Sequence, residues 1–104
     1  MSTQTTGTEA RRHEGCSFKS ILREVRGNQV KRPGSLFLVE FYTRRGLIHF
    51  AWIYNAANMA EARQRVALVR GFREIIQITR HAEVIELLIG NPADCVVHHV
   101  GRGS

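Results

Sequence analysis

Two segments of the chain, residues 36–42 and 47–54, are apolar at nearly every position. They are rich in Leu, Ile, Val and aromatic residues, which favour β-strands. The four residues between them, 43–46, include the glycine that a tight turn prefers. The pattern predicts a β-hairpin with both faces at least partly covered. Within it, Trp52 is expected to be buried or held at an interface.

Apolar residues at helical spacing predict three helices, over residues 18–26, 59–70 and 82–89. The second of these follows Asn58, which can cap a helix, and Glu61 lies three residues later as in a capping box. Glycines follow the helical patterns, as is common at helix ends.

Residues 72–79 and 94–100 contain the β-branched runs of two more strands. The predicted element order is αββαβαβ. That order indicates an α+β fold, a mixed four-stranded sheet with the helices packed mainly on one face.

The chain length of 104 residues fits one hydrophobic core. Residues 1–13 are polar and lack large apolar side chains beyond Met1, so we expect a flexible N-terminal tail. Residues 14–104 are then a single small domain.

No segment has the pattern of a secretory signal or the roughly 20 apolar residues of a membrane span. We therefore expect a soluble cytoplasmic protein without a membrane partner. Cys16 and Cys95 are too few for a disulfide scaffold and are expected to be free thiols.

Charge is distributed unevenly along the chain. Residues 1–80 hold fourteen of the fifteen Lys and Arg residues and six acidic residues, which gives 14 − 6 = +8. Residues 81–104 hold one Arg and three acidic residues, which gives 1 − 3 = −2. Arginine binds phosphate and carboxylate groups through its planar fork. The pattern favours nucleic acid or an acidic protein as the partner.

The basic residues expected to bind such a partner lie on the first helix, in the segment that follows it and at the hairpin tip. They are Lys19, Arg23, Arg26, Lys31, Arg32, Arg44 and Arg45. Arginines on amphipathic helices also commonly form a solvated face, and the sequence leaves that alternative open.

No nucleotide-binding, metalloprotease, hydrolase or redox motif is present, so we predict no cofactor and infer no small-molecule substrate. Cys95, His98 and His99 are the nearest approach to a metal site. Adjacent histidines on a strand point to opposite faces, and Cys95 and His99 are about 13 Å apart along it, so no metal site is predicted.

His49 and Glu40 are the only candidates for acid–base chemistry. A hairpin turn centred on Arg44 and Arg45 would place Glu40 opposite His49. Such a pair could serve catalysis, but a cross-strand ion pair is the simpler interpretation.

The leading hypothesis is a non-enzymatic intracellular accessory protein that binds nucleic acid through its arginine-rich surface. The alternative is a protein-interaction module: an inhibitor or adaptor acting on an acidic or nucleic-acid-handling protein, or a homodimer joined through an uncovered sheet face. Aromatic residues of the hairpin, Tyr42, Phe50, Trp52 and Tyr54, would form that interface if no helix covered them. A small enzyme using Glu40 and His49 ranks third.

Overall fold

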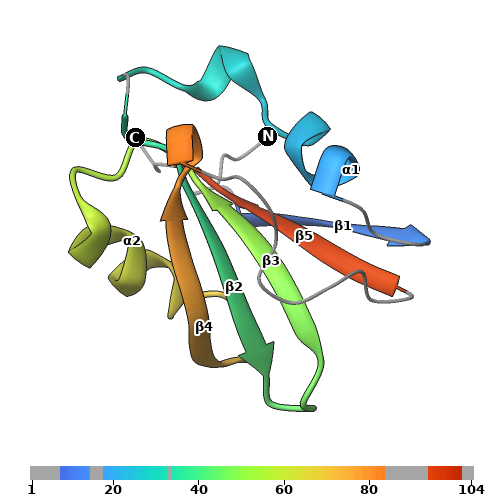
Figure 1. Cartoon of the computed structure of the whole chain (residues 1–104). Coiled ribbons are helices and arrows are strands. Elements are labelled where there is room, and N and C mark those ends of the chain that lie inside the picture. Colours follow the sequence, from blue (N-terminus) through green and yellow to red (C-terminus); the bar gives the residue numbers. More distant parts are fainter. Residues whose placement is uncertain (1–7, 15–17, 33, 84–93, 102–104) are drawn as a thin grey trace, which may run out of the picture.

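A computed structural model describes residues 8–14, 18–32, 34–83 and 94–101 of the chain (Figure 1). The strands are β1 (Thr8–Glu14), β2 (Phe37–Thr43), β3 (Ile48–Ile53), β4 (Phe72–Arg80) and β5 (Asp94–Val100). The helices are α1 (Phe18–Arg23) and α2 (Met59–Val66), with short 3₁₀ turns at Gly27–Gln29 and His81–Glu83. Within the described ranges, no helix has the length and apolar character needed to cross a membrane.

The five strands form one mixed sheet in the order β1-β5-β3-β2-β4. Only the β3–β5 pair is parallel, and the other three pairs are antiparallel. The α+β class is therefore confirmed, while the expected count of four strands is wrong. β5 lies between β1 and β3, so it is a central strand although it ends close to the end of the chain.

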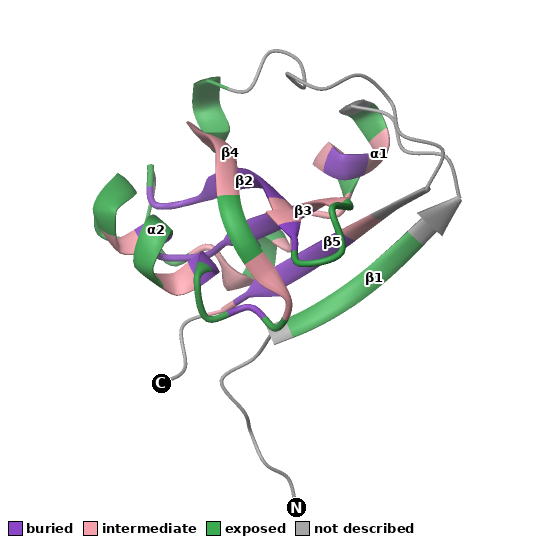
Figure 2. Cartoon of the chain, turned by 90° about the horizontal axis from the view of Figure 1, so that it is seen from below, coloured by how far each residue is buried: buried purple, intermediate pink, exposed green. Residues whose placement is uncertain are grey.

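The additional strand is β1, which occupies residues 8–14, where a flexible tail was expected over 1–13. Its described side chains, from Glu9 to Arg12, are exposed, and Figure 2 shows this edge strand in green beside the buried central strands. An edge strand is stabilised by backbone hydrogen bonds along one side and needs no apolar alternation, so the hydropathy pattern did not reveal it. Residues 1–7 lie outside the described residues.

The two helices pack on opposite faces of the sheet. On one face, Ala62 and Val66 of α2 share a core cluster with Phe41. On the other face, Ile21 of α1 shares a second cluster with Trp52. Both clusters draw on β2 and β3 because successive side chains of a strand point to opposite faces. The expectation that the helices pack mainly on one face is wrong, since strands apolar at nearly every position need cover on both sides.

Hairpin aromatics are buried beneath α1 rather than left open. Phe50, Trp52 and Tyr54 are each 0% exposed, and the Trp52 indole N–H donates a hydrogen bond of 3.0 Å to the Ile21 carbonyl. The burial expected for Trp52 is confirmed. The aromatic patch that motivated an interface on the sheet face is not present at these residues.

The loop between β2 and β3 has three residues, Arg44, Arg45 and Gly46, one more than the two-residue turn centred on Arg44 and Arg45 that was expected. The Gly46 amide donates to the Thr43 carbonyl at 2.9 Å, and the Thr43 amide donates to the Leu47 carbonyl at 2.8 Å. Gly46 has a φ of 81°, a left-handed conformation that glycine adopts without steric cost. This arrangement is a three-residue loop closed by a glycine bulge.

The longer loop shifts the strand register by one residue. Glu40 pairs with Phe50, and Phe41 pairs with His49. Because a shift of one residue exchanges the two faces of a strand, Glu40 and His49 point to opposite sides of the sheet. The expected pair of Glu40 with His49 is therefore wrong.

Several expectations for the second half of the chain are met in part. Asn58 caps α2 by accepting a 2.8 Å hydrogen bond from the Glu61 amide, which confirms that end of the helix. Residues 72–80 form β4 and residues 94–100 form β5, as expected. Of the helix expected over 82–89, the structure describes only residues 82 and 83, which belong to the 3₁₀ turn His81–Glu83, and the rest lies outside the described residues.

Replacing Trp52 by Ala is expected to lower the free energy of unfolding by about 3–5 kcal/mol, because it removes a buried indole between α1 and the sheet. Urea unfolding followed by circular dichroism measures the change. Leu68→Ala is the matched control, since Leu68 is 84% exposed and its loss should change stability little. Equal effects of the two substitutions would contradict the assignment of Trp52 to the core.

Candidate functional site

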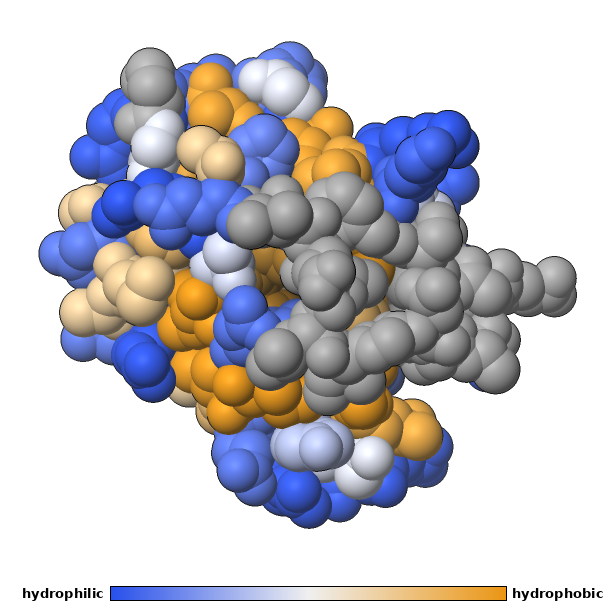
Figure 3. All heavy atoms as spheres, viewed as in Figure 1, coloured by the Kyte–Doolittle hydropathy of each residue, from blue (hydrophilic) through white to orange (hydrophobic). Residues whose placement is uncertain are grey.

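A pocket of about 720 Å³ lies at the end of the sheet where the β2–β3 hairpin turns. Its walls come from β1, the hairpin, the segment between α2 and β4, and β5. The lining residues are Arg12, Thr43, Arg44, Arg45, Gly46, Leu47, Ile48, His49, Arg70, Gly71 and Val96. Figure 3 shows the largely hydrophilic hairpin tip at the bottom of the view, and the lining residues Leu47, Ile48 and Val96 add apolar side chains. The site thus combines a charged rim with apolar walls.

Among the described residues that line the pocket, four are arginines and none is acidic. Arg12 comes from β1, Arg44 and Arg45 from the hairpin tip, and Arg70 from the segment before β4. The Arg44 amide donates a 2.8 Å hydrogen bond to the Gly71 carbonyl, which ties the hairpin tip to that segment. Three separate parts of the chain therefore contribute arginines to the lining of one pocket.

The described carboxylates that form ion pairs do so with other arginines. The pairs are Glu9–Arg26, Glu24–Arg11, Glu61–Arg65, Glu74–Arg73 and Glu83–Arg80. Within the described ranges, no ion pair involves the guanidinium groups of Arg44, Arg45 or Arg70. The positive charge of these three side chains is not neutralised by a described carboxylate.

Of the seven predicted binding residues, the structure places only Arg44 and Arg45 in this pocket. Lys19 and Arg23 are exposed on α1, which packs on the opposite face of the sheet from α2. Arg26 follows α1 and is paired with a glutamate of β1. The predicted residues therefore do not converge on a single site.

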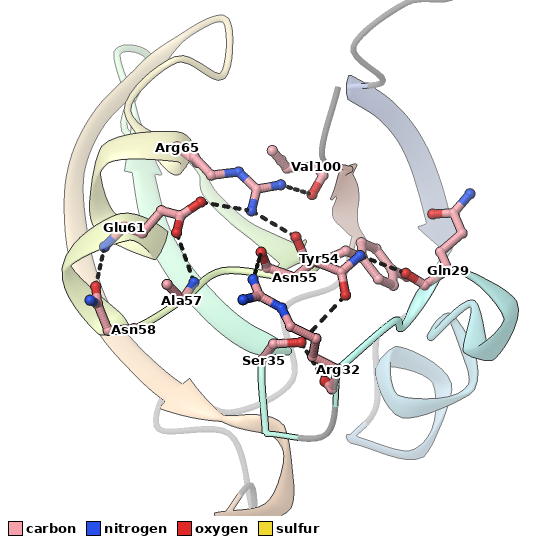
Figure 4. A network of polar contacts seen from close by, with 10 residues as sticks. All are labelled: Gln29, Arg32, Ser35, Tyr54, Asn55, Ala57, Asn58, Glu61, Arg65 and Val100. Atoms are coloured by element: carbon pink, nitrogen blue, oxygen red, sulfur yellow. Dashed lines mark hydrogen bonds and ion pairs between the residues drawn. The ribbon is translucent and has the colours of Figure 1, made fainter. Parts of the chain in front are cut away.

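Lys31 and Arg32 belong to a polar network around Asn55. The Arg32 guanidinium donates to the Asn55 carbonyl at 2.7 Å, and the Asn55 side-chain amide donates to the Gln29 carbonyl at 2.8 Å (Figure 4). The Lys31 amide donates to Asn55 Oδ1 at 2.7 Å. Asn55 has a φ of 58°, a left-handed conformation that asparagine adopts more readily than most residues. The network ties the segment after α1 to the end of β3, so Arg32 has a structural role.

Arg12 and Arg70 complete the pocket and were not among the predicted residues. The sequence placed Arg12 in the expected tail and Arg70 at the end of the helix expected over 59–70. No local sequence pattern connects them to the hairpin tip, because Arg12 is brought there by the pairing of β1 with β5 and of β5 with β3, and Arg70 by the pairing of β2 with β4.

His49 lies in the pocket wall and contacts a second histidine, His98 of β5. His49 Nδ1 and His98 Nε2 are 2.9 Å apart, and both rings pack against Phe41. His98 is 7% exposed, and burial lowers its pKa to about 4, with smaller contributions from the neighbouring His49 and His99. Burial also lowers the pKa of His49. Both rings are therefore neutral at pH 7, and one donates a hydrogen bond to the other.

His99 occupies the opposite face of β5, beneath α1. Its Nδ1 lies 2.9 Å from the Tyr54 hydroxyl and its Nε2 lies 2.9 Å from Glu24 Oε1. His99 is 2% exposed, and burial lowers its pKa, although the hydrogen bond to Glu24 acts in the other direction. These three side chains are buried away from the pocket, and the network anchors the segment after α1 to β3 and β5.

His98 and His99 are buried because β5 is a central strand of the sheet. They point to opposite faces, as strand alternation predicts. Among the described side chains, no three from His, Cys, Asp and Glu lie close enough together to hold a metal ion. The Cys95 side chain lies outside the described residues.

The free energy of unfolding is expected to fall as the pH drops from about 6.5 to about 4, because unfolded histidine binds a proton in this range while folded His98 stays neutral. The His98 contribution is roughly 3 kcal/mol, from a shift of about 6.5 to about 4. His49 and His99 change stability in the same direction, since their pKa values are also lowered.

Urea unfolding of the protein and of His98→Phe across this pH range measures the effect. The variant should show a shallower pH dependence, whereas the exposed His81→Gln should keep the original slope. An unchanged slope in His98→Phe would show that His98 is not held neutral in the fold.

Comparisons with protein-family models, with curated proteins and with solved structures find no match to this chain. The α+β architecture is shared by proteins of unrelated function, so the fold does not indicate an activity. The chemistry of the arginine-lined pocket is therefore the basis for a functional proposal.

Proposed function

We propose that this protein binds nucleic acid, with phosphate groups held by Arg12, Arg44, Arg45 and Arg70 in the pocket beside the hairpin. The observation that carries the proposal is the convergence of four arginines on a pocket whose described lining contains no acidic residue. Guanidinium groups bind phosphate oxygens through paired, charge-assisted hydrogen bonds. Phosphate contacts of this kind supply most of the affinity of sequence-independent nucleic-acid binding.

The shape of the pocket favours a nucleotide unit over a bare anion. Its volume of about 720 Å³ lies within the range of about 300–1,000 Å³ typical of sites that enclose small organic molecules. Leu47, Ile48 and Val96 add apolar surface to the walls, against which a base or sugar could pack. A concave site of this kind suits a single strand better than the regular surface of a duplex.

The alternative of a protein-interaction module loses its main support. It depended on hairpin aromatics left uncovered, and Phe50, Trp52 and Tyr54 are buried. An acidic protein segment would meet the same arginines, but the pocket offers depth for a nucleotide rather than an extended apolar face.

Replacing Arg44 and Arg45 together by Gln is expected to weaken binding of a short single-stranded oligonucleotide by about tenfold or more, equivalent to at least about 1.4 kcal/mol. It should also make the salt dependence shallower, since each lost phosphate contact removes about 0.7 from the slope of log K against log salt. Fluorescence anisotropy at two salt concentrations measures both quantities.

The matched control is the double substitution of Lys19 and Arg23 by Gln, which removes the same charge from the exposed surface of α1. It should leave affinity nearly unchanged. Equal losses in the two double variants would indicate diffuse electrostatic attraction instead of binding at the pocket. No binding by the unaltered protein at low salt would refute the proposal.

A further inference from the structure

Among the described residues that line the pocket, His49 is the one titratable side chain that can exchange a proton near neutral pH, because the four arginines stay charged. Its Nδ1 is occupied by the contact with His98, 2.9 Å away. Within the described residues, no hydrogen bond involves His49 Nε2. The second ring nitrogen is thus available to a ligand in the pocket.

His98 determines which proton transfer His49 can perform. If His49 takes up a proton at Nε2, both of its ring nitrogens become donors, and its Nδ1–H then needs an acceptor. The lone pair on Nε2 of neutral His98 supplies it at 2.9 Å. Burial of His98 against Phe41 keeps that ring neutral and fixes its position. The histidine pair therefore supports His49 as a base, with His98 as a positioning residue.

The described part of the pocket lining offers no protein nucleophile beside this base. Thr43 is the only residue with a hydroxyl group among these lining residues, and its Oγ1 accepts hydrogen bonds from the Arg45 and Leu47 amides. A reaction at phosphorus must then use a nucleophile from the substrate or from solvent. In RNA, the ribose 2′-hydroxyl lies next to the phosphate that the arginines would hold, so it requires no separate positioning.

We infer that the pocket cleaves RNA, with His49 Nε2 accepting the proton of a 2′-hydroxyl as that oxygen attacks the adjacent phosphorus. This inference rests on the proposed binding of nucleic acid. The bond from phosphorus to the 5′-oxygen breaks, and the 5′-oxygen leaves with the electron pair and takes a proton from water. The resulting hydroxide removes the proton from His49. The products are a 2′,3′-cyclic phosphate and a free 5′-hydroxyl.

The arginines stabilise the charge that develops on the phosphoryl oxygens as the 2′-oxygen adds. The groups around His49 are Arg12 from β1, Arg44 and Arg45 from the hairpin, Arg70 from the segment before β4, and His98 from β5. The arginines do not titrate in the accessible pH range. The acid side of the pH–rate profile therefore reports on the histidine pair.

The test uses three labelled single strands of the same sequence: RNA, 2′-O-methyl RNA and DNA. Binding is measured by anisotropy, and cleavage by denaturing gel with analysis of the new ends. We expect all three to bind and only RNA to be cut, leaving cyclic phosphate ends. His49→Gln should bind RNA normally but cleave it at least about 100-fold more slowly, the usual contribution of a general base. His81→Gln, exposed and outside the pocket lining, should cleave at the original rate.

Each contrary result has a distinct meaning. RNA that is bound and left intact, or cut equally well by His49→Gln, would overturn the inference and leave the binding function in place. Cleavage of DNA or of 2′-O-methyl RNA would also overturn it, because water would then be the nucleophile. Failure of all three strands to bind would remove the proposed function together with the inference.

A second measurement separates positioning by His98 from mere structural support. Cleavage should decline only below the ordinary histidine pKa of 6.5, because burial lowers the pKa of His49. His98→Asn retains an acceptor for His49 Nδ1 and should keep more kcat than His98→Phe, which has none, at similar KM. Equal kcat in the two folded variants would contradict the positioning role.

Discussion

Parallel pairing of β5 with β3 is the constraint on which the rest of the molecule depends. It places His98 beside Ala51 and His99 beside Trp52 in the register of the sheet. Strand alternation then sends the two adjacent histidines to opposite faces. β5 thereby supplies a buried imidazole to each face of the sheet, His98 on the pocket side and His99 on the α1 side. β5 also pairs with β1 along its other edge.

The ends of β3 and β5 are held together by side chains as well as by the sheet. The Arg65 guanidinium of α2 donates to the Tyr54 carbonyl at 2.7 Å and to the Val100 carbonyl at 3.0 Å (Figure 4). The Tyr54 hydroxyl reaches His99 on the same strand pair. Buried polar groups stabilise a fold only when their partners are in place, so these contacts favour a single arrangement of the strands. A rigid β3–β5 pair in turn fixes the distance between His49 and His98.

Local patterns in the sequence were sufficient for the hairpin, for the cap of α2 at Asn58 and for the burial of Trp52. These features depend on neighbouring residues, whose spacing encodes them directly. The register of the hairpin depended on whether Gly46 forms part of a turn or a bulge, and the sequence TRRG is compatible with both. A difference of one residue there separated Glu40 from His49 and made the expected cross-strand pair impossible.

The features that sequence reasoning missed are those created by long-range pairing. β1 has no apolar alternation, because it lies at an edge and is held by its backbone. Without β1 there is no reason to place Arg12 near the hairpin, and without a central β5 the two histidines look like surface residues. Arg44 and Arg45 stand out in the sequence only by their charge. The other arginines of the pocket, Arg12 and Arg70, come from distant parts of the chain.

The arginine-lined pocket is the point at which this structure departs most from what stability alone would favour. Like charges held near one another repel, and among the described residues Arg44, Arg45 and Arg70 form no ion pair, whereas five other arginines pair with carboxylates. Natural proteins tend to keep such local conflicts where function requires them. A bound phosphate would neutralise the repulsion, so binding and relief of electrostatic strain would act in the same direction. The neutral pair of His49 and His98 fits the same interpretation, because a charged imidazole in the pocket wall would add to the repulsion between the arginines. A neutral His49 remains able to take up a proton once an anion has bound.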